Sequence, residues 1–280
     1  MDNVTVGIQG FEGSFHEMAA RSFFGASVAL QPCATFREVA QWAASEHPNQ
    51  VSVMAIENSI AGSILPNYSL LQQYQLNIIG EVYLHIHQHL LVNKGVQLQQ
   101  IQEVHSHPMA LLQCMQFLEA HPFKLIETAD TALSAKELQK SGSTTHAVIA
   151  SKLAAELFNL DVLAPDIHTM RNNYTRFWVL AANGSNTISD TANKASLQFE
   201  VAHTIGSLAT LLSQMAALGL NVSKLQSMPI PGTAFSYMFY ADVEFASIDV
   251  LKAALVTLKQ VAAQLQVLGI YHNNKHTIEV

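Results

Sequence analysis

Short apolar runs alternate with polar turns and helical segments over the first two thirds of the chain. Residues 4–8 and 51–56 have the length and spacing of strands, and each run is followed by a polar turn and a helical segment. This alternation is typical of an α/β fold, in which helices cover a mostly parallel sheet. The repeated units give two sets of strand ends, so we expect two α/β lobes that face each other across a cleft.

The pattern changes after residues 184–194, a polar stretch of small residues with the composition of a linker. Beyond it, strand-like and helix-like segments follow in the order βαββαβ within ~80 residues, which is the ferredoxin-like arrangement. We therefore predict an α/β chain with a two-lobed domain over residues 1–183, a linker over 184–194 and a ferredoxin-like domain over 195–275. The chain is expected to pass between the two lobes near residues 80 and 165.

The composition restricts the kinds of function that the chain can have. Of 280 residues, 49% are apolar and 12% are charged, and the formal net charge is −7, so we expect a globular protein without the basic face that nucleic acid requires. Cys33 and Cys114 are too few for a disulfide framework and lack metal-ligand spacing. No apolar stretch is long enough to span a membrane, and residues 1–3 do not begin a signal peptide, so a cytoplasmic protein is expected.

A glycine-rich turn at residues 7–13 joins the first strand to a helix that opens at Ser14 with a Ser-x-x-Glu capping box. Free backbone N–H groups at such a turn suit an anion. The glycine spacing differs from that of dinucleotide-binding motifs, and residues 27–31 contain no acid that could bind a ribose. We therefore expect no dinucleotide, and no other cofactor.

Three histidines alternate along residues 81–92, which we predict to form one long strand. His85, His87 and His89 share a face of that strand, as a set of metal ligands would. At ~3.4 Å per residue the outer two are ~13 Å apart, so the three cannot easily bind one ion. A pair could bind one, but the sequence indicates no further ligand, and we predict no metal site.

Residues 172–177 read Asn-Asn-Tyr-Thr-Arg-Phe and precede a strongly apolar run. Arg171 and Arg176 are two of only four arginines in the chain. A planar guanidinium beside amide and hydroxyl donors is suited to a carboxylate ligand, which it can hold through two hydrogen bonds. The alternative is a polar loop that leads into a buried strand, with Arg176 in a structural ion pair.

Other polar side chains follow strands and are therefore expected at the same cleft. Glu57, Asn58 and Ser59 come directly after the buried strand at residues 51–56, although a cap for the next helix is an alternative role for them. The corresponding positions of the second lobe hold Ser106, His107, Thr131 and Ser151.

Six short blocks stand out in order along nearly the whole chain. One is Asn173-Tyr174-Thr175-Arg176-Phe177, and the other five are residues 10–15, 57–63, 106–108, 130–132 and 149–151. Together they resemble the prephenate dehydratase family with a C-terminal ACT domain, in which the first block reads Asn-x-Thr-Arg-Phe. The chorismate mutase segment that is fused to some members has no counterpart, since strand-like sequence starts at Val4, so a monofunctional member is expected.

The resemblance implies a periplasmic-binding-protein-like domain of two lobes, which converts prephenate to phenylpyruvate with loss of water and carbon dioxide. No cofactor is needed, because the ring becomes aromatic. By resemblance, activity depends on Thr175; we predict that it hydrogen-bonds the departing hydroxyl and that Arg176 holds a carboxylate. Glu57 or His107 is predicted to supply the proton, since a threonine hydroxyl is too weak an acid. The remaining predicted contacts are neutral donors that line the cleft: Asn58, Ser59, Ser106, Thr131 and Asn173.

The phenylalanine site of the family pairs a Gly-Ala-Leu-Ala-like block with a Glu-Ser-Arg-Pro-like block. Gly206-Ser207-Leu208-Ala209 matches the first, whereas Gln226-Ser227-Met228-Pro229 lacks the Glu and the Arg of the second. These residues and Asn221 are the predicted contacts of L-phenylalanine. The resemblance implies feedback regulation in a homodimer or homotetramer, and the missing charges leave its strength and sign open. The alternative is an ACT domain that only dimerises.

Two other functions are compatible with the sequence. One is an arogenate dehydratase, whose substrate carries an additional ammonium group and would require an acidic partner in the cleft. The other is a non-catalytic amino-acid sensor with a binding-protein-like cleft. The presence of Thr175 beside Arg176 favours an enzyme.

Overall fold

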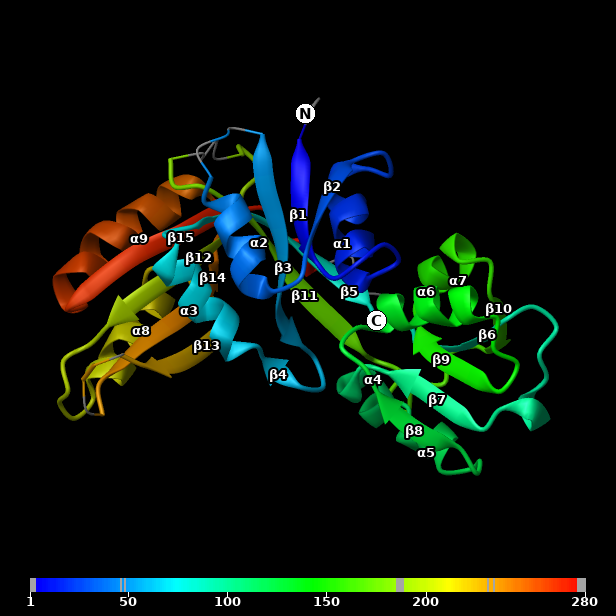
Figure 1. Cartoon of the computed structure of the whole chain (residues 1–280). Helices are drawn as coiled ribbons and strands as arrows, with labels where there is room; N and C mark the ends of the chain where they lie inside the picture. Colours follow the sequence, from blue (N-terminus) through cyan, green and yellow to red (C-terminus); the bar gives the residue numbers. More distant parts are fainter. Residues whose placement is uncertain are drawn as a thin grey trace.

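The computed structural model describes residues 4–45, 47, 49–184, 189–230, 232–233 and 235–275. Residues 1–3, on which the signal-peptide expectation rested, and residues 185–188 of the expected linker lie outside this description. None of the helices within the described residues is long and apolar enough to cross a bilayer. The described chain forms two lobes and a third unit, each built on its own sheet (Figure 1).

The first lobe has a six-stranded sheet in the order β2-β1-β3-β11-β5, with β4 paired to β3. β1, β2 and β3 are parallel, whereas β11 runs antiparallel to both β3 and β5. Its strands are β1 (Thr5–Gln9), β2 (Ala29–Cys33), β3 (Gln50–Asn58), β4 (Gly62–Ser63), β5 (Asn77–His85) and β11 (Tyr174–Ala181). Its helices are α1 (Phe15–Phe24), α2 (Phe36–Ala43) and α3 (Leu65–Gln73).

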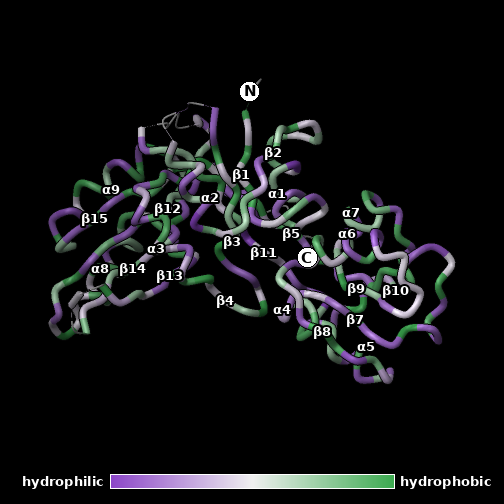
Figure 2. The backbone as a smooth tube through the Cα atoms, in the orientation of Figure 1, coloured by the Kyte–Doolittle hydropathy of each residue, from purple (hydrophilic) through white to green (hydrophobic). Residues whose placement is uncertain are grey.

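The second lobe has a five-stranded sheet in the order β10-β6-β9-β7-β8. Apolar residues lie along its strands, as the green colour of β9 in Figure 2 shows. Its strands are β6 (His89–Val92), β7 (Glu103–Ser106), β8 (Lys124–Glu127), β9 (His146–Ala150) and β10 (Asp161–Ala164). Its helical elements are η1 (Leu98–Gln100), α4 (Pro108–Gln113), α5 (Met115–Leu118), α6 (Thr131–Ser141) and α7 (Lys152–Leu157).

The chain crosses between the lobes twice, at residues 86–88 and again at residues 165–173. The first crossing lies beyond the expected position near residue 80, because β5 pairs with β11 as far as His85. The single long strand expected over residues 81–92 is therefore wrong. It consists of two strands, β5 and β6, which belong to different sheets.

The third unit has the order βαββαβ and a four-stranded antiparallel sheet, β13-β14-β12-β15. This topology is ferredoxin-like, so the expected fold class is confirmed. Its elements are β12 (Lys194–Glu200), α8 (Ser207–Ala217), β13 (Asn221–Pro229), β14 (Tyr237–Glu244), α9 (Ile248–Val261) and β15 (Gln264–Tyr271).

The ferredoxin-like unit packs directly on the first lobe rather than hanging from a flexible tether. Met54 and Trp178 of the first lobe share one apolar cluster with Tyr240 and Leu268 of the ferredoxin-like sheet. At Gly269 a Cβ atom would lie 2.0 Å from the carbonyl oxygen of Ile78, so only glycine allows β15 to approach β5 this closely. The first-lobe sheet therefore has one face toward this unit and one face toward α1 and the second lobe.

The glycine-rich turn after β1 contacts the second lobe. Gly13 has a φ of +87°, and a Cβ on it would lie 2.9 Å from Cα of Ala154. The Ser151 hydroxyl donates a 2.6 Å hydrogen bond to the carbonyl oxygen of Gly13, whose N–H donates to Glu17 Oε2 at 2.7 Å. The amide of Gly13 is thus occupied within the protein, and this turn joins the lobes instead of binding an anion through that group.

Candidate active site

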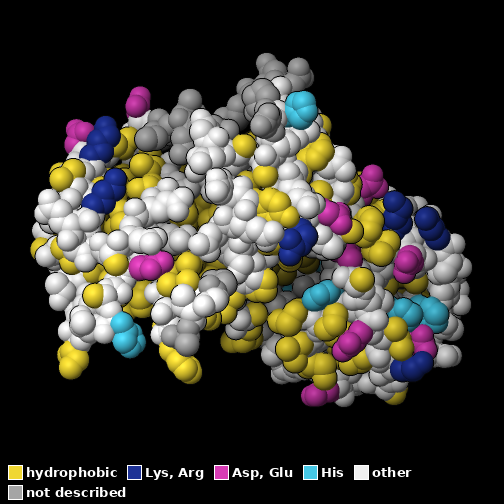
Figure 3. Space-filling view, turned by 60° about the vertical axis from the view of Figure 1, so that its left-hand side comes forward, with side chains coloured by type: hydrophobic (Ala, Val, Ile, Leu, Met, Phe, Trp, Pro, Cys, Tyr) yellow, Lys and Arg dark blue, Asp and Glu magenta, His cyan; other side chains and the backbone are white. Residues whose placement is uncertain are grey.

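A cavity of about 480 Å³ lies between the two lobes. In the space-filling view of Figure 3, a groove separates the rounded second lobe from the rest of the molecule. The walls come from β1, α1, β3 and β11 on one side and from α4 and α6 on the other, with the first crossing segment also in contact. The polar residues that line the cavity are Gln9, Ser14, His16, Asn58, Gln88, His107, Gln113, Asp130, Thr131 and Thr175.

Thr175 and Asn58 face the cavity together because they are opposite each other in the β11–β3 register. Asn58 Nδ2 donates to Thr175 Oγ1 at 3.0 Å and to Asn173 Oδ1 at 2.8 Å. The Asn58 side chain is itself held in place, since its Oδ1 accepts the backbone N–H groups of Ile60 and Ala61. Because Thr175 Oγ1 already accepts a hydrogen bond, its own hydrogen is available to a ligand in the cavity.

Asn173 lies behind this pair and links the lobes. It is fully buried, and its Nδ2 donates to Gln113 Oε1 of α4 at 3.0 Å. Asn58 of the first lobe is therefore connected through Asn173 to a helix of the second lobe. We predicted Asn173 as a lining donor; the structure instead makes it a support for the residue that orients Thr175.

His107 and Asp130 bring helix N-termini to the second-lobe wall. His107 Nδ1 accepts the N–H of Met109 at 3.2 Å, so the proton of the neutral imidazole is on Nε2. Asp130 caps α6 by accepting the N–H of Leu133 at 2.8 Å, and burial raises the pKa of this carboxyl although backbone hydrogen bonds oppose the shift. Thr131, also expected here, lines the cavity beside it.

His16 of α1 is a neutral lining residue that sequence analysis missed. Its Nε2 accepts the N–H of Ala55 at 3.3 Å, and its ring meets Phe177 edge-on. Burial lowers the pKa of His16 to about 3, so its ring carries no charge near neutrality. The capping box identified the start of α1, but no local signal indicated that His16 would face a ligand cavity.

Three glutamines of the cavity were also missed. Gln9 ends β1 and could have been found by the rule that ligands lie beyond strand ends. Gln88 lies in the first crossing segment and Gln113 ends α4, so neither carries such a signal. All three place neutral amide groups in the cavity wall.

Arg176 does not face this cavity, and its predicted role as a carboxylate clamp there is wrong. Successive residues of a strand point to opposite faces, so Arg176 points away from the cleft when Thr175 points into it. Its side chain is 3% exposed and lies against the ferredoxin-like unit. Nε donates to Glu81 at 2.7 Å, Nη2 donates to the Tyr271 hydroxyl at 3.1 Å, and Nη1 pairs with Asp242. The structural ion pair, given as the alternative, describes this residue.

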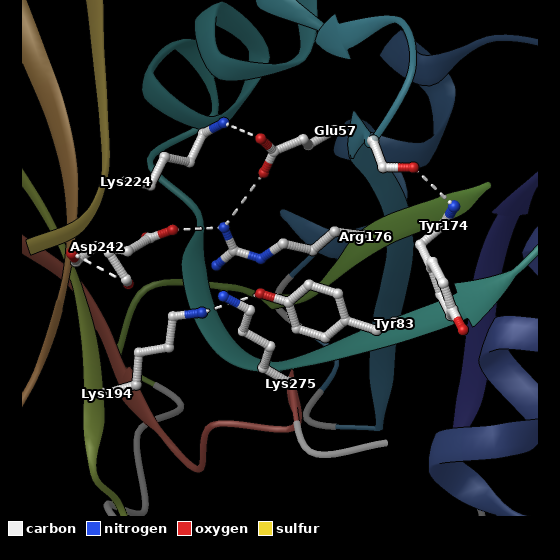
Figure 4. Close-up of a pocket in the computed structure, with 10 residues that line it drawn as sticks. Glu57, Tyr83, Tyr174, Arg176, Lys194, Lys224, Asp242 and Lys275 are labelled. Atoms are coloured by element: carbon white, nitrogen blue, oxygen red, sulfur yellow. Dashed lines mark hydrogen bonds and ion pairs between the residues drawn. The ribbon is translucent and has the colours of Figure 1, made fainter. Parts of the chain in front are cut away.

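A buried charge network surrounds Arg176 (Figure 4). Lys194 Nζ donates to both carboxylate oxygens of Glu81 at 2.9 Å and to the Tyr83 hydroxyl at 3.1 Å. Burial by itself would raise the pKa of Asp242, but the charges of Arg176 and Lys194 hold that pKa below its ordinary value. The network therefore keeps its charges in the interior and joins β5 and β11 to β12, β14 and β15.

Three more predicted catalytic residues lie outside the cavity lining. Glu57 pairs with Lys224 at 2.5 Å and Arg176 at 3.8 Å, on the face toward the ferredoxin-like unit, so it is not placed to protonate a ligand in the cleft. Ser59 is exposed and bonds the carbonyl oxygen of Asn172. Ser106 is fully buried and donates to the carbonyl oxygen of Ile149, which ties β7 to β9. Each of the three is bonded to other groups of the protein and does not line the cavity.

The predicted effector residues do not gather at one place within this chain. Ser207 and Leu208, in the first turn of α8, line a cavity of about 690 Å³ together with Tyr237 and Phe239. Gly206 is the N-cap of α8 with a φ of +83°, and Ala209 follows within the helix. The β13 residues Asn221, Gln226, Ser227, Met228 and Pro229 do not line that cavity. Met228 is 8% exposed in the cluster shared with the first lobe, and the predicted contact of this β13 segment with L-phenylalanine stays a prediction.

Replacing Arg176 tests the charge network. Arg176→Met leaves Glu81 and Asp242 buried with one cation fewer, and removing one partner of a buried pair typically costs about 3–5 kcal/mol. We expect the free energy of unfolding, measured by urea titration, to fall by that amount. Arg171→Met, at an exposed arginine of the same stretch, should change it by less than about 0.5 kcal/mol. Equal effects of the two changes would contradict the assignment.

The burial of His16 predicts a loss of stability in mild acid. The folded protein excludes a proton from His16 down to about pH 3, whereas the unfolded chain binds one below its ordinary pKa of 6.5. The contribution is complete above that value and is lost as the pH falls. From pH 7 to pH 5, His16 should remove about 2 kcal/mol from the free energy of unfolding. In urea titrations, the free energy of unfolding of His16→Gln should change with pH by this much less than that of the native protein. His47→Gln, at an exposed histidine, is the control and should keep the native pH dependence.

Known proteins resemble this chain over most of its length. A family model described as prephenate dehydratase matches residues 6–185. Arogenate dehydratase/prephenate dehydratase 1, chloroplastic, of Arabidopsis thaliana is 34% identical over 287 residues, covering 96% of this chain and 72% of the relative. The bifunctional chorismate mutase/prephenate dehydratase of Enterobacter agglomerans is 34% identical over 267 residues, covering 94% and 69%.

Two solved structures superpose over nearly the whole chain. Prephenate dehydratase from Arthrobacter aurescens, in complex with L-Phe, has a TM-score of 0.86 at 26% identity and covers 99% of this chain and 92% of its own. GqqA, named as a novel type of quorum quenching acylase, has a TM-score of 0.86 at 27% identity and covers 98% and 99%. The family match over residues 6–185 and the relatives at 34% identity show that the chain belongs to the prephenate dehydratase family.

Proposed function

We propose that this chain is a lyase that converts prephenate to phenylpyruvate in the cavity between its two lobes. The observation that carries the proposal is the Thr175 hydroxyl, which faces the cavity with its oxygen held by Asn58. The carbon–carboxylate bond of the ring breaks and releases carbon dioxide, and the electron pair moves through the ring to expel the hydroxyl. That hydroxyl takes up one proton and leaves as water, and the ring becomes aromatic.

Thr175 is proposed to donate a hydrogen bond to the departing hydroxyl. Negative charge develops on that oxygen as the bond breaks, so a donor fixed in place stabilises the transition state more than the ground state. A threonine hydroxyl does not give up its proton readily, so a second group must supply it. His107, with its proton on Nε2, and Asp130, with a raised pKa, are the titratable residues at the second-lobe wall that fit this role.

The substrate carboxylates are proposed to bind helix N-termini and neutral donors. Among the described residues, no Lys or Arg lines the cavity. The first turns of α1, α4 and α6 all reach it, and a helix N-terminus attracts an anion through its dipole and its free N–H groups. The amides of Gln9, Gln88 and Gln113 add donors between these ends. This set takes the place of the guanidinium clamp that we expected.

Substitutions of Thr175 test the catalytic role. Thr175→Ala removes the donor, and loss of one such donor typically lowers kcat about 10²–10³-fold. Thr175→Ser keeps the hydroxyl and should retain most of the turnover of prephenate, measured by phenylpyruvate formation. Both proteins should unfold at similar urea concentrations, because Thr175 is at the cavity surface. Near-normal turnover by Thr175→Ala would refute the role.

Arogenate is the second candidate substrate, because Asp130 places a carboxyl group in the cavity that could meet its ammonium. Parallel assays with prephenate and arogenate distinguish the two. If arogenate is the substrate, the native protein has the higher kcat/KM with arogenate. Formation of phenylpyruvate or phenylalanine by the native protein rules out a purely sensory role.

The ferredoxin-like unit is proposed to be an ACT domain that binds L-phenylalanine near the N-terminus of α8. The cavity there offers polar backbone at Ser207 and the aromatic rings of Tyr237 and Phe239, which suit an amino acid with a ring. Apolar side chains are exposed on the same unit, among them Ile205 and Phe235, so we propose that it also joins copies of the chain into a homodimer or homotetramer. The charge network then lies between this unit and the strand that carries Thr175.

Addition of L-phenylalanine should lower the rate of prephenate turnover. Leu208→Glu places a charge in the lining of the α8 cavity and should weaken the response at least about tenfold in effector concentration. Leu157→Glu, at an exposed leucine of the second lobe, is the matched control and should respond normally. If phenylalanine changes neither the turnover rate nor the size of the oligomer, the proposed regulation is wrong and the domain only joins copies of the chain.

A further inference from the structure

The two segments that cross between the lobes bring three imidazole rings together. His85 ends β5, His87 follows it in the first crossing, and His168 lies in the second crossing. One ring nitrogen from each residue lies within 4.8 Å of the other two. The sequence showed only the histidines that alternate near His85, because His168 is distant along the chain and comes into reach only when the second crossing returns beside the first.

Hydrogen bonds orient two of these rings so that each keeps a lone pair available. His87 Nδ1 bonds Asp166 Oδ1 at 2.6 Å, and a carboxylate only accepts, so the proton of the neutral ring is on Nδ1 and its lone pair is on Nε2. His85 Nε2 bonds the carbonyl oxygen of Arg171 at 2.7 Å, which leaves the lone pair of His85 on Nδ1. Carboxylate and carbonyl partners of this kind orient the histidines of metal sites.

His168 is the buried member of the cluster, at 7% exposure. The neutral form of an imidazole is the form that binds metals. The hydrogen bond that it receives, from the N–H of Gln88, is 3.4 Å long. A bond of this length is weak, and a cation could displace it at small cost.

We propose that His85, His87 and His168 form a binding site for a divalent transition-metal ion of the zinc class, with Asp166 orienting His87 from behind. Imidazole nitrogens suit zinc, copper and nickel better than calcium or magnesium. In a tetrahedral zinc site with Zn–N bonds of about 2.0–2.1 Å, the nitrogens are roughly 3.3 Å apart. Side-chain rotations that move the ring nitrogens by about an ångström would bring them to this spacing. The His87 side chain is 45% exposed, which leaves solvent a route to the fourth position.

Asp166 of the second crossing bonds two histidines, His87 through its carboxylate and His89 through its backbone N–H. Its φ is +50°, a left-handed conformation that few residues other than glycine adopt, and its N–H donates to His89 Nδ1 at 3.1 Å. His89 is outside the cluster of three and bonds Asp166 instead. An ion bound by His85, His87 and His168 would add a direct link between the crossings, next to Gln88 of the cavity wall.

A second cluster supplies an internal control. Glu103, His105 and His146 also place one ligand atom each within 4.8 Å of one another. Both oxygens of the Glu103 carboxylate, however, are already paired, Oε1 with Lys124 Nζ at 2.9 Å and Oε2 with His105 Nε2 at 3.0 Å. This cluster has the residue types of a metal site without an available carboxylate.

The experiment is a zinc titration of the full chain after its metals have been removed with a chelator. Isothermal titration calorimetry with ZnCl₂ should show one strong site per chain, and Co²⁺ in its place should give the visible absorption of a nitrogen-rich site. His87→Gln and His168→Gln should each weaken binding about tenfold or more, and Asp166→Asn by about tenfold. His146→Gln should leave the strong site unchanged.

Three results would overturn the proposal: no saturable binding, equal affinity in the native protein and His87→Gln, or a loss confined to His146→Gln. Because His87 and Asp166 are partly exposed, their variants should fold normally and decide the question even if the buried His168→Gln does not fold. The readout is the affinity for the metal alone, so the result does not depend on which substrate the cleft accepts.

Discussion

The alternation of side chains along β11 places the cavity-lining residues on one face of the first-lobe sheet and the buried charge network on the other. Thr175 and Phe177 face the cleft, whereas Arg176 and Trp178 face the ferredoxin-like unit, because neighbours in a strand point in opposite directions. A single short motif thus serves two faces of one sheet. The position of the cavity wall relative to the buried charges follows from the pairing of β11 with β3 and β5.

The two faces differ in their electrostatics. Behind the sheet, the buried Arg176 and Lys194 are paired with carboxylates, and an unpaired charge at such positions would be very costly. At the cleft, the described lining residues include no Lys or Arg, and the polarity comes from amides, hydroxyls, two imidazoles, the Asp130 carboxyl group and helix N-termini. A site of this kind depends on fixed dipoles, which need no flexible side chain to be ordered when a ligand binds.

The crossing segments connect this site to the relative position of the lobes. Asn173 lies in the second crossing and bridges Asn58 to Gln113 of the second lobe, so the support of Thr175 includes both lobes. The histidine cluster lies in the same two segments. Gly13 and Ser151 add a direct contact between the lobes away from the crossings. Movement of one lobe would therefore alter the hydrogen bonds that orient the hydroxyl at the cleft.

The amino-acid sequence alone determined the α/β class, the βαββαβ unit and the capped helices, because hydrophobic periodicity and capping boxes are local properties. The sequence also predicted four residues of the cavity lining, because each lies at the end of an element that faces the cleft: Asn58, His107, Thr131 and Thr175. Tertiary structure decided the rest. Whether Glu57 and Arg176 face a ligand or a neighbouring domain depends on the strand register, and His168 joins His85 only through the return of the second crossing. Such contacts join residues far apart in the chain, and no local pattern records them.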